Sequence, residues 1–347
     1  MIVLVTGGAG FIGSNFLLSS VPSYPQHSFV NVDKLTYAAN LGNLRALDGA
    51  ANYAFERADI AEQGAIPGIF EKYRPELVVH FAAESHVDRS IHGPREFIRT
   101  NVEGTFNLLE ACRTLWPRGS GLFHHVSTDE VYGSCDDGGV FTEESPYRPS
   151  NPYAASKAAS DHLVRAYGRT YELPFKISNC SNNYGPHQFP EKLIPLMISN
   201  ALERQPLPVY GRGTNVRDWL YVTDHCRAIW SVITRGRPFE TYNVGGGCEL
   251  RNIDLVEQLC RMLAAETGTA PEQLLELIQF VEDRPGHDQR YALDASKLER
   301  ECGFSPSESF ESGLRKTVRW YLNHPEWLAS VRTGEYRRWL DQNYAGR

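Results

Sequence analysis

The sequence predicts an α/β fold, in which a doubly wound parallel sheet is joined by a smaller, interleaved C-terminal lobe. Two observations carry this prediction. Short apolar runs alternate with helical stretches through the first half of the chain. The first of these runs ends in a glycine-rich turn that opens a helical stretch. Helices that connect parallel strands produce this alternation, and such sheets bind ligands at the carboxyl ends of their strands.

Composition limits the function further. The chain has 347 residues, of which 41% are hydrophobic and 22% are charged, so it can bury a large core. Its net charge of −7 argues against general binding to nucleic acids or membrane surfaces. An anionic substrate must therefore be bound by local cations. No apolar run approaches membrane-spanning length, and no signal peptide precedes the first strand.

Cysteine and histidine positions give little support for a metal or disulfide site. The seven cysteines are scattered and never form a Cys-x-x-Cys pair, which favours free thiols and a reducing cytoplasm. His80, His86 and His92 recur at intervals of six, a spacing that does not share a helix face. We therefore expect no metal.

The first predicted strand, residues 1–6, runs directly into a glycine-rich turn. Gly7, Gly10 and Gly13 fit Gly-x-x-Gly-x-x-Gly, Gly8 starts a Gly-x-Gly-x-x-Gly pattern, and a helical stretch follows from Ser14. Glycines are needed here because backbone amides and a helix N-terminus must approach a pyrophosphate. The strand before and the helix after meet the structural condition for a Rossmann dinucleotide-binding site.

The next two strands each end near an acid. Residues 28–33 end at Asp33, whose carboxylate can accept hydrogen bonds from both ribose hydroxyls and would repel a 2′-phosphate, which favours NAD over NADP. A turn cap is the alternative role for Asp33. Residues 53–57 precede Asp59, which is placed equally well to reach the adenine or to cap a helix.

The fourth strand, residues 77–81, opens into a segment suited to a flat cofactor. Ala82 and Ala83 are small enough to let the backbone approach it, and Glu84 and Ser85 offer polar contacts beyond. A long helical stretch over residues 94–115 follows and carries Thr100 and Asn101.

The fifth strand, residues 122–126, leads into the polar cluster that organises the predicted site. Thr128, Asp129 and Glu130 follow at the expected carboxyl edge of the sheet. Downstream, Tyr153 and Lys157 are spaced i, i+4, so the phenol and ammonium share one helix face, where the cation can lower the pKa of the phenol. Such a pair is usually a solvated surface pair. The independent acidic cluster and the glycine turn favour a catalytic base instead.

The second half predicts a substrate-binding lobe. A sixth strand over residues 174–180 precedes a polar loop, after which the β-α rhythm loosens. We assign residues 1–184 to an NAD-binding Rossmann domain, with later segments near 213–245 joining the sheet, and 185–347 mainly to the lobe. Residues 310–320 form an amphipathic stretch that should cover this lobe.

Candidate substrate contacts in the lobe are mainly cations in polar contexts: Lys192, Arg217, Arg284 and His287. Arginine binds phosphate in a bidentate manner, although any one of these side chains is more often a surface charge. Tyr210 could stack on a base, but a core tyrosine is the stronger alternative.

Taken together, these segments resemble the dTDP-glucose 4,6-dehydratases of the extended short-chain dehydrogenase/reductase superfamily, over nearly the whole chain. The glycine turn and Tyr-x-x-x-Lys are shared across the superfamily. The triplet of Thr128, Asp129 and Glu130 is more specific, because the similar sugar-nucleotide epimerases do not typically carry both acids. Further matching stretches lie at residues 33–38, 82–90, 179–186, 190–195 and 284–288.

The resemblance implies a chemistry for these residues, with NAD as cofactor and a dTDP-hexose as substrate. Tyr153, assisted by Lys157 and Thr128, would take the 4-hydroxyl proton while C4 gives hydride to NAD. The 4-ketone acidifies C5; Glu130 would then remove the C5 proton, and Asp129 would protonate the departing 6-hydroxyl. Hydride finally returns to C6. Adjacent acids with opposite protonation states need environments that separate their pKa values.

The resemblance also implies binding residues and an assembly. The cofactor contacts are Gly7, Gly10, Phe11, Ile12, Gly13, Asp33, Lys34, Leu35, Thr36, Asp59, Ile60, Phe81, Ala82, Ala83, Ser85, Thr100, Tyr153, Lys157 and Asn183. The substrate contacts are Ser85, Thr128, Asn182, Lys192, Leu193, Pro208, Tyr210, Arg217, Asn252, Arg284 and His287. A homodimer is expected through the helices over residues 94–115 and 151–171.

Three alternatives remain open. After Gly185-Pro186 the chain has His187-Gln188, where the family commonly has Tyr followed by His or Gln, so a UDP-sugar 4,6-dehydratase is possible. A 4-epimerase or decarboxylase of the same superfamily would share Tyr153 and Lys157. A non-catalytic dinucleotide-sensing protein would keep the fold alone.

Overall fold

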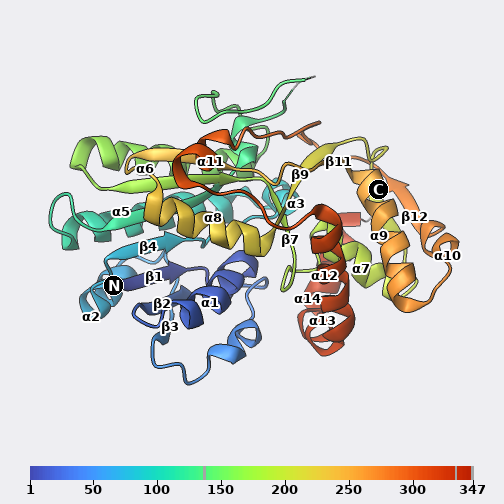
Figure 1. The fold of residues 1–347 in the computed structure, drawn as a ribbon, viewed down its shortest axis with the longest axis horizontal. Coiled ribbons are helices and arrows are strands. Elements are labelled where there is room, and N and C mark those ends of the chain that lie inside the picture. Colours follow the sequence, from blue (N-terminus) through green and yellow to red (C-terminus); the bar gives the residue numbers. More distant parts are fainter. Residues whose placement is uncertain (136–137, 333, 345–347) are drawn as a thin grey trace.

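A seven-stranded parallel sheet with helices on both faces forms one side of the molecule, and a smaller lobe built largely from the C-terminal third lies beside it (Figure 1). The computed structural model describes residues 1–135, 138–332 and 334–344. This arrangement confirms the predicted fold class, a doubly wound parallel sheet with an interleaved smaller lobe.

The sheet has the strand order β10-β6-β5-β4-β1-β2-β3, and all neighbours run parallel. Its strands are β1 (Ile2–Thr6), β2 (Ser28–Asp33), β3 (Tyr53–Arg57), β4 (Leu77–His80), β5 (Leu122–Thr128), β6 (Phe175–Cys180) and β10 (Glu240–Val244). The order reverses at β1, because β2 lies on one side of it and β4 on the other. Ligands of such sheets bind beyond the carboxyl ends of the strands at this reversal.

Alternate residues of each strand face opposite layers of helices. Leu4 of β1 belongs to a core formed with α2 (Ala65–Tyr73), α5 (Gly104–Leu115) and α6 (Pro152–Tyr171). Val3 and Val5 pack on the other face with α1 (Phe11–Ser23) and α8 (Val222–Arg235). Both faces of the sheet are therefore buried, which explains why strands such as β1 and β4 appear in the sequence as largely apolar runs.

The predicted helix over residues 94–115 is continuous but not uniform. It consists of α4 (Pro94–Phe97), a π-helical segment η2 (Ile98–Glu103) and α5. The π segment holds Asn101, which is buried and bonds three ways. Its side-chain oxygen accepts from the Glu84 amide at 2.8 Å, and its nitrogen donates to the Glu84 carbonyl and the Ser156 hydroxyl. Asn101 thus ties the segment after β4 to α6.

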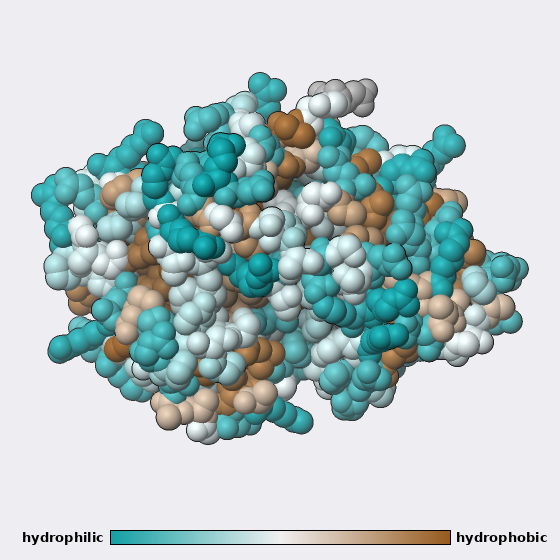
Figure 2. All heavy atoms as spheres, viewed as in Figure 1, coloured by the Kyte–Doolittle hydropathy of each residue, from teal (hydrophilic) through white to brown (hydrophobic). Residues whose placement is uncertain are grey.

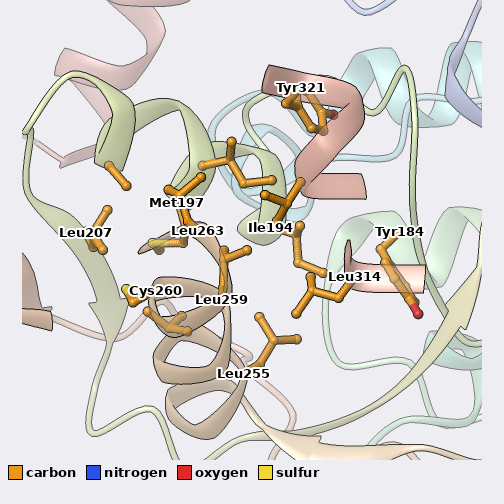
Figure 3. Packing of buried hydrophobic residues seen from close by; sticks show 14 of the residues in the cluster. Tyr184, Ile194, Met197, Leu207, Leu255, Leu259, Cys260, Leu263, Leu314 and Tyr321 are labelled. Atoms are coloured by element: carbon orange, nitrogen blue, oxygen red, sulfur yellow. The ribbon is translucent and has the colours of Figure 1, made fainter. Parts of the chain in front are cut away.

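The smaller lobe has its own apolar core. Figure 3 shows leucines of α9 (Asn252–Thr267) pointing toward Ile194 and Met197 of α7 (Leu193–Leu202), with Leu314 and Tyr321 of α12 (Phe310–Asn323) closing the cluster. The predicted amphipathic stretch over residues 310–320 therefore lies on the lobe, as expected. Burial of each such side chain contributes about 1.5–3 kcal/mol.

Two small sheets complete the lobe and its connection to the large sheet. One has the order β11-β9-β7 and the other pairs β12 with β8. Their strands are β7 (Asn182–Tyr184), β8 (Leu207–Tyr210), β9 (Val216–Tyr221), β11 (Glu249–Arg251) and β12 (Ile278–Val281). The α-helices not yet named are α3 (Val87–His92), α10 (Pro271–Leu275), α11 (Ser296–Cys302), α13 (Pro325–Val331) and α14 (Gly334–Tyr344). Within residues 213–245, β10 joins the large sheet and α8 covers it, whereas β9 belongs to a small sheet.

The exterior is that of a water-exposed protein on the face in Figure 2, where hydrophobic residues are scattered among hydrophilic ones. Across the part of the chain that the structure describes, no helix combines the length and apolar character needed to cross a membrane.

Candidate active site

The glycine turn between β1 and α1 is a close-packed backbone crossing. Gly7 has a φ of 73°, and a Cβ there would lie 2.6 Å from the Ala82 amide nitrogen. A Cβ on Gly13 would lie 2.3 Å from the Gly7 carbonyl oxygen. Helix α1 starts at Phe11, three residues earlier than predicted, with Gly10 as its N-cap. The first amides of α1 therefore face the crevice, as an anion site requires.

Asp33 closes the other side of this turn at the end of β2. One carboxylate oxygen accepts from the Ala9 amide at 2.9 Å and the other from the Leu35 amide at 2.8 Å. Burial raises the pKa of Asp33, although both hydrogen bonds and the charge of Lys34 oppose this shift. The turn-capping role and the ribose-binding role are compatible, because each carboxylate oxygen keeps a second lone pair.

A cavity of about 290 Å³ runs from this turn, past the ends of β4 and β5, to the start of α7. Most of the predicted residues line it: Gly7, Gly10, Phe11, Ile12, Gly13, Asp33, Lys34, Thr36, Ile60, Phe81, Ala82, Ala83, Ser85, Thr100, Thr128, Asp129, Glu130, Tyr153, Lys157, Asn182, Asn183 and Lys192. Residues from positions 7 to 192 thus meet at one edge of the sheet. Their individual roles stay predictions.

The acidic pair sits on a single turn of helix directly after β5. Thr128 is the N-cap of this turn, η3 (Asp129–Tyr132), and its hydroxyl accepts from the Glu130 amide at 3.3 Å. The same hydroxyl donates to an Asp129 carboxyl oxygen at 3.3 Å. The side-chain amide of Asn151, the N-cap of α6, donates to Glu130 at 3.5 Å. The caps of two helices therefore position both acids.

The two acids differ in their surroundings. Asp129 is 2% exposed, and burial, followed by the negative charges of Glu130 and Asp218, raises the pKa of its carboxyl group well above the usual range. The charge of Arg217 and the hydrogen bond from Thr128 oppose this shift only in part. Burial therefore favours the protonated form of Asp129, which is the form that a general acid must have.

Tyr153 lies in the first turn of α6, buried against the cavity, and Lys157 follows one turn later. Burial, and next the charge of Glu130, raise the pKa of Tyr153 well above its usual value, while a hydrogen bond with Thr128 lowers it. The lowering by Lys157 that the spacing predicts is not seen. The Lys157 ammonium instead donates to the Val126 carbonyl at 2.9 Å.

On the lobe side, Lys192 and its neighbour Glu191 anchor the segment before α7. The Lys192 ammonium donates to the Ser85 carbonyl at 2.7 Å. Glu191 accepts from Arg89 at 2.9 Å and from the Tyr37 hydroxyl at 2.8 Å. The Arg89 guanidinium lies 3.7 Å from the centre of the Tyr37 ring.

Trp339 of α14 also contacts this guanidinium, with its ring centre 4.3 Å away. Tyr37 follows the predicted cofactor residues 33–36, and Glu191 precedes Lys192. The contacts of Arg89 with Tyr37, Glu191 and Trp339, called the Arg89 cage here, therefore connect the segments at the two ends of the cavity. The sequence analysis did not select Arg89, Glu191 or Trp339, since their spacing along the chain carries no pattern.

A second group of predicted substrate residues lies next to the acidic pair but outside the wall of this cavity. Arg284 forms an ion pair with Asp88 at 3.6 Å, and the Tyr210 hydroxyl donates to the same carboxylate at 3.2 Å. The His287 ring lies 6.0 Å from the Tyr210 ring. The positive charges of Arg217 and Arg284 both act on Glu130. These cations therefore place a positive potential beside the acids.

The other predicted residues do not line the cavity, and Asp59 among them bonds to the backbone. Asp59 accepts from the Ala61 amide at 2.9 Å and pairs with Arg99 at 3.0 Å, so it stabilises a turn while its neighbour Ile60 lines the cavity. Leu35, Leu193, Pro208 and Asn252 are likewise absent from the wall described above. Their contacts with ligands stay predictions.

His187 departs from the family pattern, whereas Gln188 matches it, and the two side chains have different surroundings. The His187 ring packs edge-on against Trp320 at 4.6 Å. Gln188 lines the cavity, and its side-chain amide donates to the Asn183 carbonyl at 2.9 Å. Gln188, Phe189, Ser127, Cys180 and Ser181 also line the cavity without having been selected from the sequence.

The described residues contain no cluster of three or more histidine, cysteine or acidic side chains arranged to bind a metal ion. His80 instead bonds Thr6 at 2.7 Å and Thr105 at 3.0 Å within the sheet core. All seven cysteines are free thiols.

Comparison with known proteins places this geometry in context. A family model described as GDP-mannose 4,6-dehydratase matches residues 4–317. A dTDP-glucose 4,6-dehydratase from Shigella flexneri is 53% identical over the full length of both chains.

Solved structures are similar as well. The crystal structure of a Bacillus anthracis dTDP-glucose 4,6-dehydratase in complex with NAD superposes with a TM-score of 0.86 at 45% identity, covering 95% of this chain and 99% of that one. A Thermus thermophilus UDP-glucose 4-epimerase in complex with NAD is 31% identical with a TM-score of 0.82, covering 93% and 99%. The dehydratase is thus the more similar of these two NAD-binding enzymes.

Proposed function

This chain belongs to the GDP-mannose 4,6-dehydratase family, and we propose that it is an NAD-dependent dTDP-glucose 4,6-dehydratase, a hydro-lyase that forms dTDP-4-keto-6-deoxyglucose. The single observation that carries this proposal is the pair of adjacent acids at the cavity, in which burial, with Glu130 and Asp218 nearby, raises the pKa of Asp129. Oxidation alone needs no such pair, whereas elimination of water needs both an acid and a base.

Bound NAD supplies a hydride acceptor and later the hydride donor. Tyr153, in its phenolate form, takes the proton of the 4-hydroxyl as hydride leaves C4, so the phenol must first lose its own proton despite its raised pKa. The new ketone makes the C5 proton acidic, and Glu130 removes it while Asp129 gives its proton to the departing 6-hydroxyl as water. Hydride then adds to C6 and Glu130 returns its proton to C5. Lys157 and Thr128 hold Tyr153 and the sugar hydroxyl in position.

This series of reaction steps changes the protonation states of two side chains. After one turnover Tyr153 has gained a proton and Asp129 has lost one, because the product keeps the ketone. The hydroxyl of Thr128 bonds Tyr153 and also donates to Asp129. Thr128 is thus placed to carry the proton from the phenol back to the carboxylate.

Residues of this chain support NAD as its cofactor. The backbone crossing at Gly7 and Gly13 leaves no space for a side chain, as close approach to a pyrophosphate requires. Asp33 at the end of β2 favours ribose hydroxyls over a 2′-phosphate. The lobe contributes Lys192, Arg217 and Arg284 for the diphosphate of the substrate.

Incubation with dTDP-glucose deuterated at C4 tests the proposal directly. We expect deuterium at C6 of a 4-keto-6-deoxy product, because the hydride that leaves C4 returns to C6. A 4-epimerase or decarboxylase would not move the label to C6, and label retained at C4 would reject the dehydratase assignment. Absence of turnover on dTDP-, UDP- and GDP-hexoses, with NAD bound, would support a dinucleotide sensor instead.

We further propose that the protein is a cytoplasmic homodimer, with residues 1–184 as the NAD-binding domain and 185–347 mainly as the substrate lobe. Seven free thiols support a reducing compartment. Two large apolar side chains on the helix over residues 94–115 support the dimer, since Ile98 is 47% and Phe106 is 44% exposed. This helix packs beside α6, so both predicted dimer helices offer one surface.

We expect Phe106→Glu to weaken dimerisation about 30-fold or more, because it buries a charge where an aromatic side chain would pack. Sedimentation equilibrium measures the association constant. Phe280→Glu is the matched control, since Phe280 is 58% exposed on β12 of the smaller lobe. Equal association of both variants would place the interface elsewhere.

A further inference from the structure

Lys157 is a buried cation whose immediate partners are neutral. The residue is 4% exposed, and its ammonium donates to the Val126 carbonyl at 2.9 Å. Carbonyl and imidazole groups compensate only part of the cost of removing a charge from water. The fold must therefore provide an anion close to this ammonium.

Asp161 is placed to be that anion. It follows Lys157 by one turn of α6, and its side chain is fully buried. His125 of β5 lies between the two groups. Its Nε2 atom is 3.2 Å from an Asp161 carboxylate oxygen and 3.4 Å from the Lys157 ammonium nitrogen. Carboxylate, imidazole and ammonium thus lie next to one another in the protein interior, and because Nε2 can bond only one of the two, the carboxylate acts on the ammonium mainly through its charge.

The hydrogen bonds of Tyr147 show that Asp161 acts as an acceptor. The Tyr147 hydroxyl accepts from Arg165 at 2.9 Å and from the Asn179 side chain at 3.1 Å. These donors occupy its two lone pairs, so its only proton is donated to Asp161, which lies 2.8 Å away. Tyr147 thus holds one carboxylate oxygen of Asp161, and His125 lies against the other.

The charges around Lys157 agree with this geometry. The titratable groups whose charges interact with Lys157 are Asp161 on α6, His125 on β5, His80 on β4 and Cys180 on β6. Burial lowers the pKa of Lys157 to about 8, and the charge of Asp161 is the main effect that opposes this lowering. Burial also raises the pKa of Asp161, but His125, Lys157 and Tyr147 outweigh it, so the pKa lies below its usual value.

We propose that Asp161 is a positioning residue for the reaction: the negative charge of its carboxylate, which lies against His125, keeps the ammonium of Lys157 charged and in place one helical turn from Tyr153. Asp161 does not line the cavity and acts only through Lys157. For its activity readout, the inference rests on the proposed function.

The pH profile of kcat tests this role with Asp161→Asn, which removes the charge and keeps the shape. The protonated form of Lys157 is present below its pKa of about 8 and is lost as the pH rises through that value. Without the anion this pKa falls further. We therefore expect the alkaline loss of activity to begin about one pH unit lower than in the wild type.

Tyr147→Phe is the matched control, because it removes a hydrogen bond to Asp161 and leaves the charge. We expect its alkaline limb to stay at the wild-type position, and Asp161→Glu to restore that position. An unshifted limb in Asp161→Asn, or an equal shift in Tyr147→Phe, would reduce Asp161 to a packing role and overturn the proposal.

A second measurement needs no substrate and so is independent of the proposed function. Removing one member of a buried pair leaves the other charge uncompensated, whereas removing both does not. We expect Lys157→Met/Asp161→Asn to have a higher Tm than Asp161→Asn, or to recover the fold if that single variant does not fold. A double variant whose Tm falls by the sum of the single decreases, or that fails to fold together with Asp161→Asn, would contradict the coupling.

Discussion

Glu130→Gln is expected to stop the reaction after the first hydride transfer, lowering turnover by about 10³-fold, within the range typical of a general base. Glutamine keeps the size of the side chain and its contact with Asn151 but cannot take the C5 proton. Because Tyr153 still oxidises C4, enzyme-bound NADH should accumulate without dehydrated product. Its absorbance after mixing with dTDP-glucose, together with product analysis, measures both steps.

Two further variants are needed to interpret this result. Asp129→Asn should stall at the same stage, since an amide cannot protonate the departing hydroxyl. Glu110→Gln removes a carboxylate of α5 that pairs with Arg113, accepts from the Tyr167 hydroxyl and does not line the cavity, so it should leave elimination unchanged. If Glu130→Gln retained wild-type turnover, the assignment of the C5 base would be wrong.

The fold could be predicted from the sequence wherever a strand is buried on both faces. Residues 2–6 and 77–80 appear as largely apolar runs because helices cover both sides of the sheet, and their boundaries in the structure agree with the prediction within a residue. The lobe gave no such signal. Its strands β7 and β11 have three residues each, too few for a periodic pattern to emerge.

The site was predictable where several functional residues occur close together in one segment. Thr128, Asp129 and Glu130 are consecutive, and Tyr153 and Lys157 share one helix turn. The cage of Arg89, Glu191 and Trp339 was not predictable, because it joins three elements far apart in the chain.

The spacing of residues along the chain was also insufficient to predict their pKa values. The i, i+4 pair lies on one helix, yet Lys157 points its ammonium at the Val126 carbonyl, and burial dominates the pKa of Tyr153. The protonation of Asp129 likewise depends on Asp218, which lies on β9 and comes near only in the folded chain. Such charges are set by tertiary contacts, so a sequence pattern shows which groups meet but not their protonation states.

Tyr153→Phe separates the oxidation step from elimination and should have an effect at least as large, about 10³-fold or more on turnover. Phenylalanine fills the same space against Phe97 but cannot take the 4-hydroxyl proton. Because no ketone forms, C5 never becomes acidic and the acids have nothing to act on. Neither NADH nor product should appear, in contrast to Glu130→Gln.

A double variant tests whether oxidation of C4 precedes the elimination of water. A double variant, Tyr153→Phe with Glu130→Gln, should resemble Tyr153→Phe alone, because oxidation precedes elimination and the second loss is then not expressed. NADH accumulation in the double variant would show that another group deprotonates the 4-hydroxyl. Thr128, whose hydroxyl contacts both Tyr153 and Asp129, would then be the candidate, and Thr128→Val in the Tyr153→Phe background would remove the remaining signal.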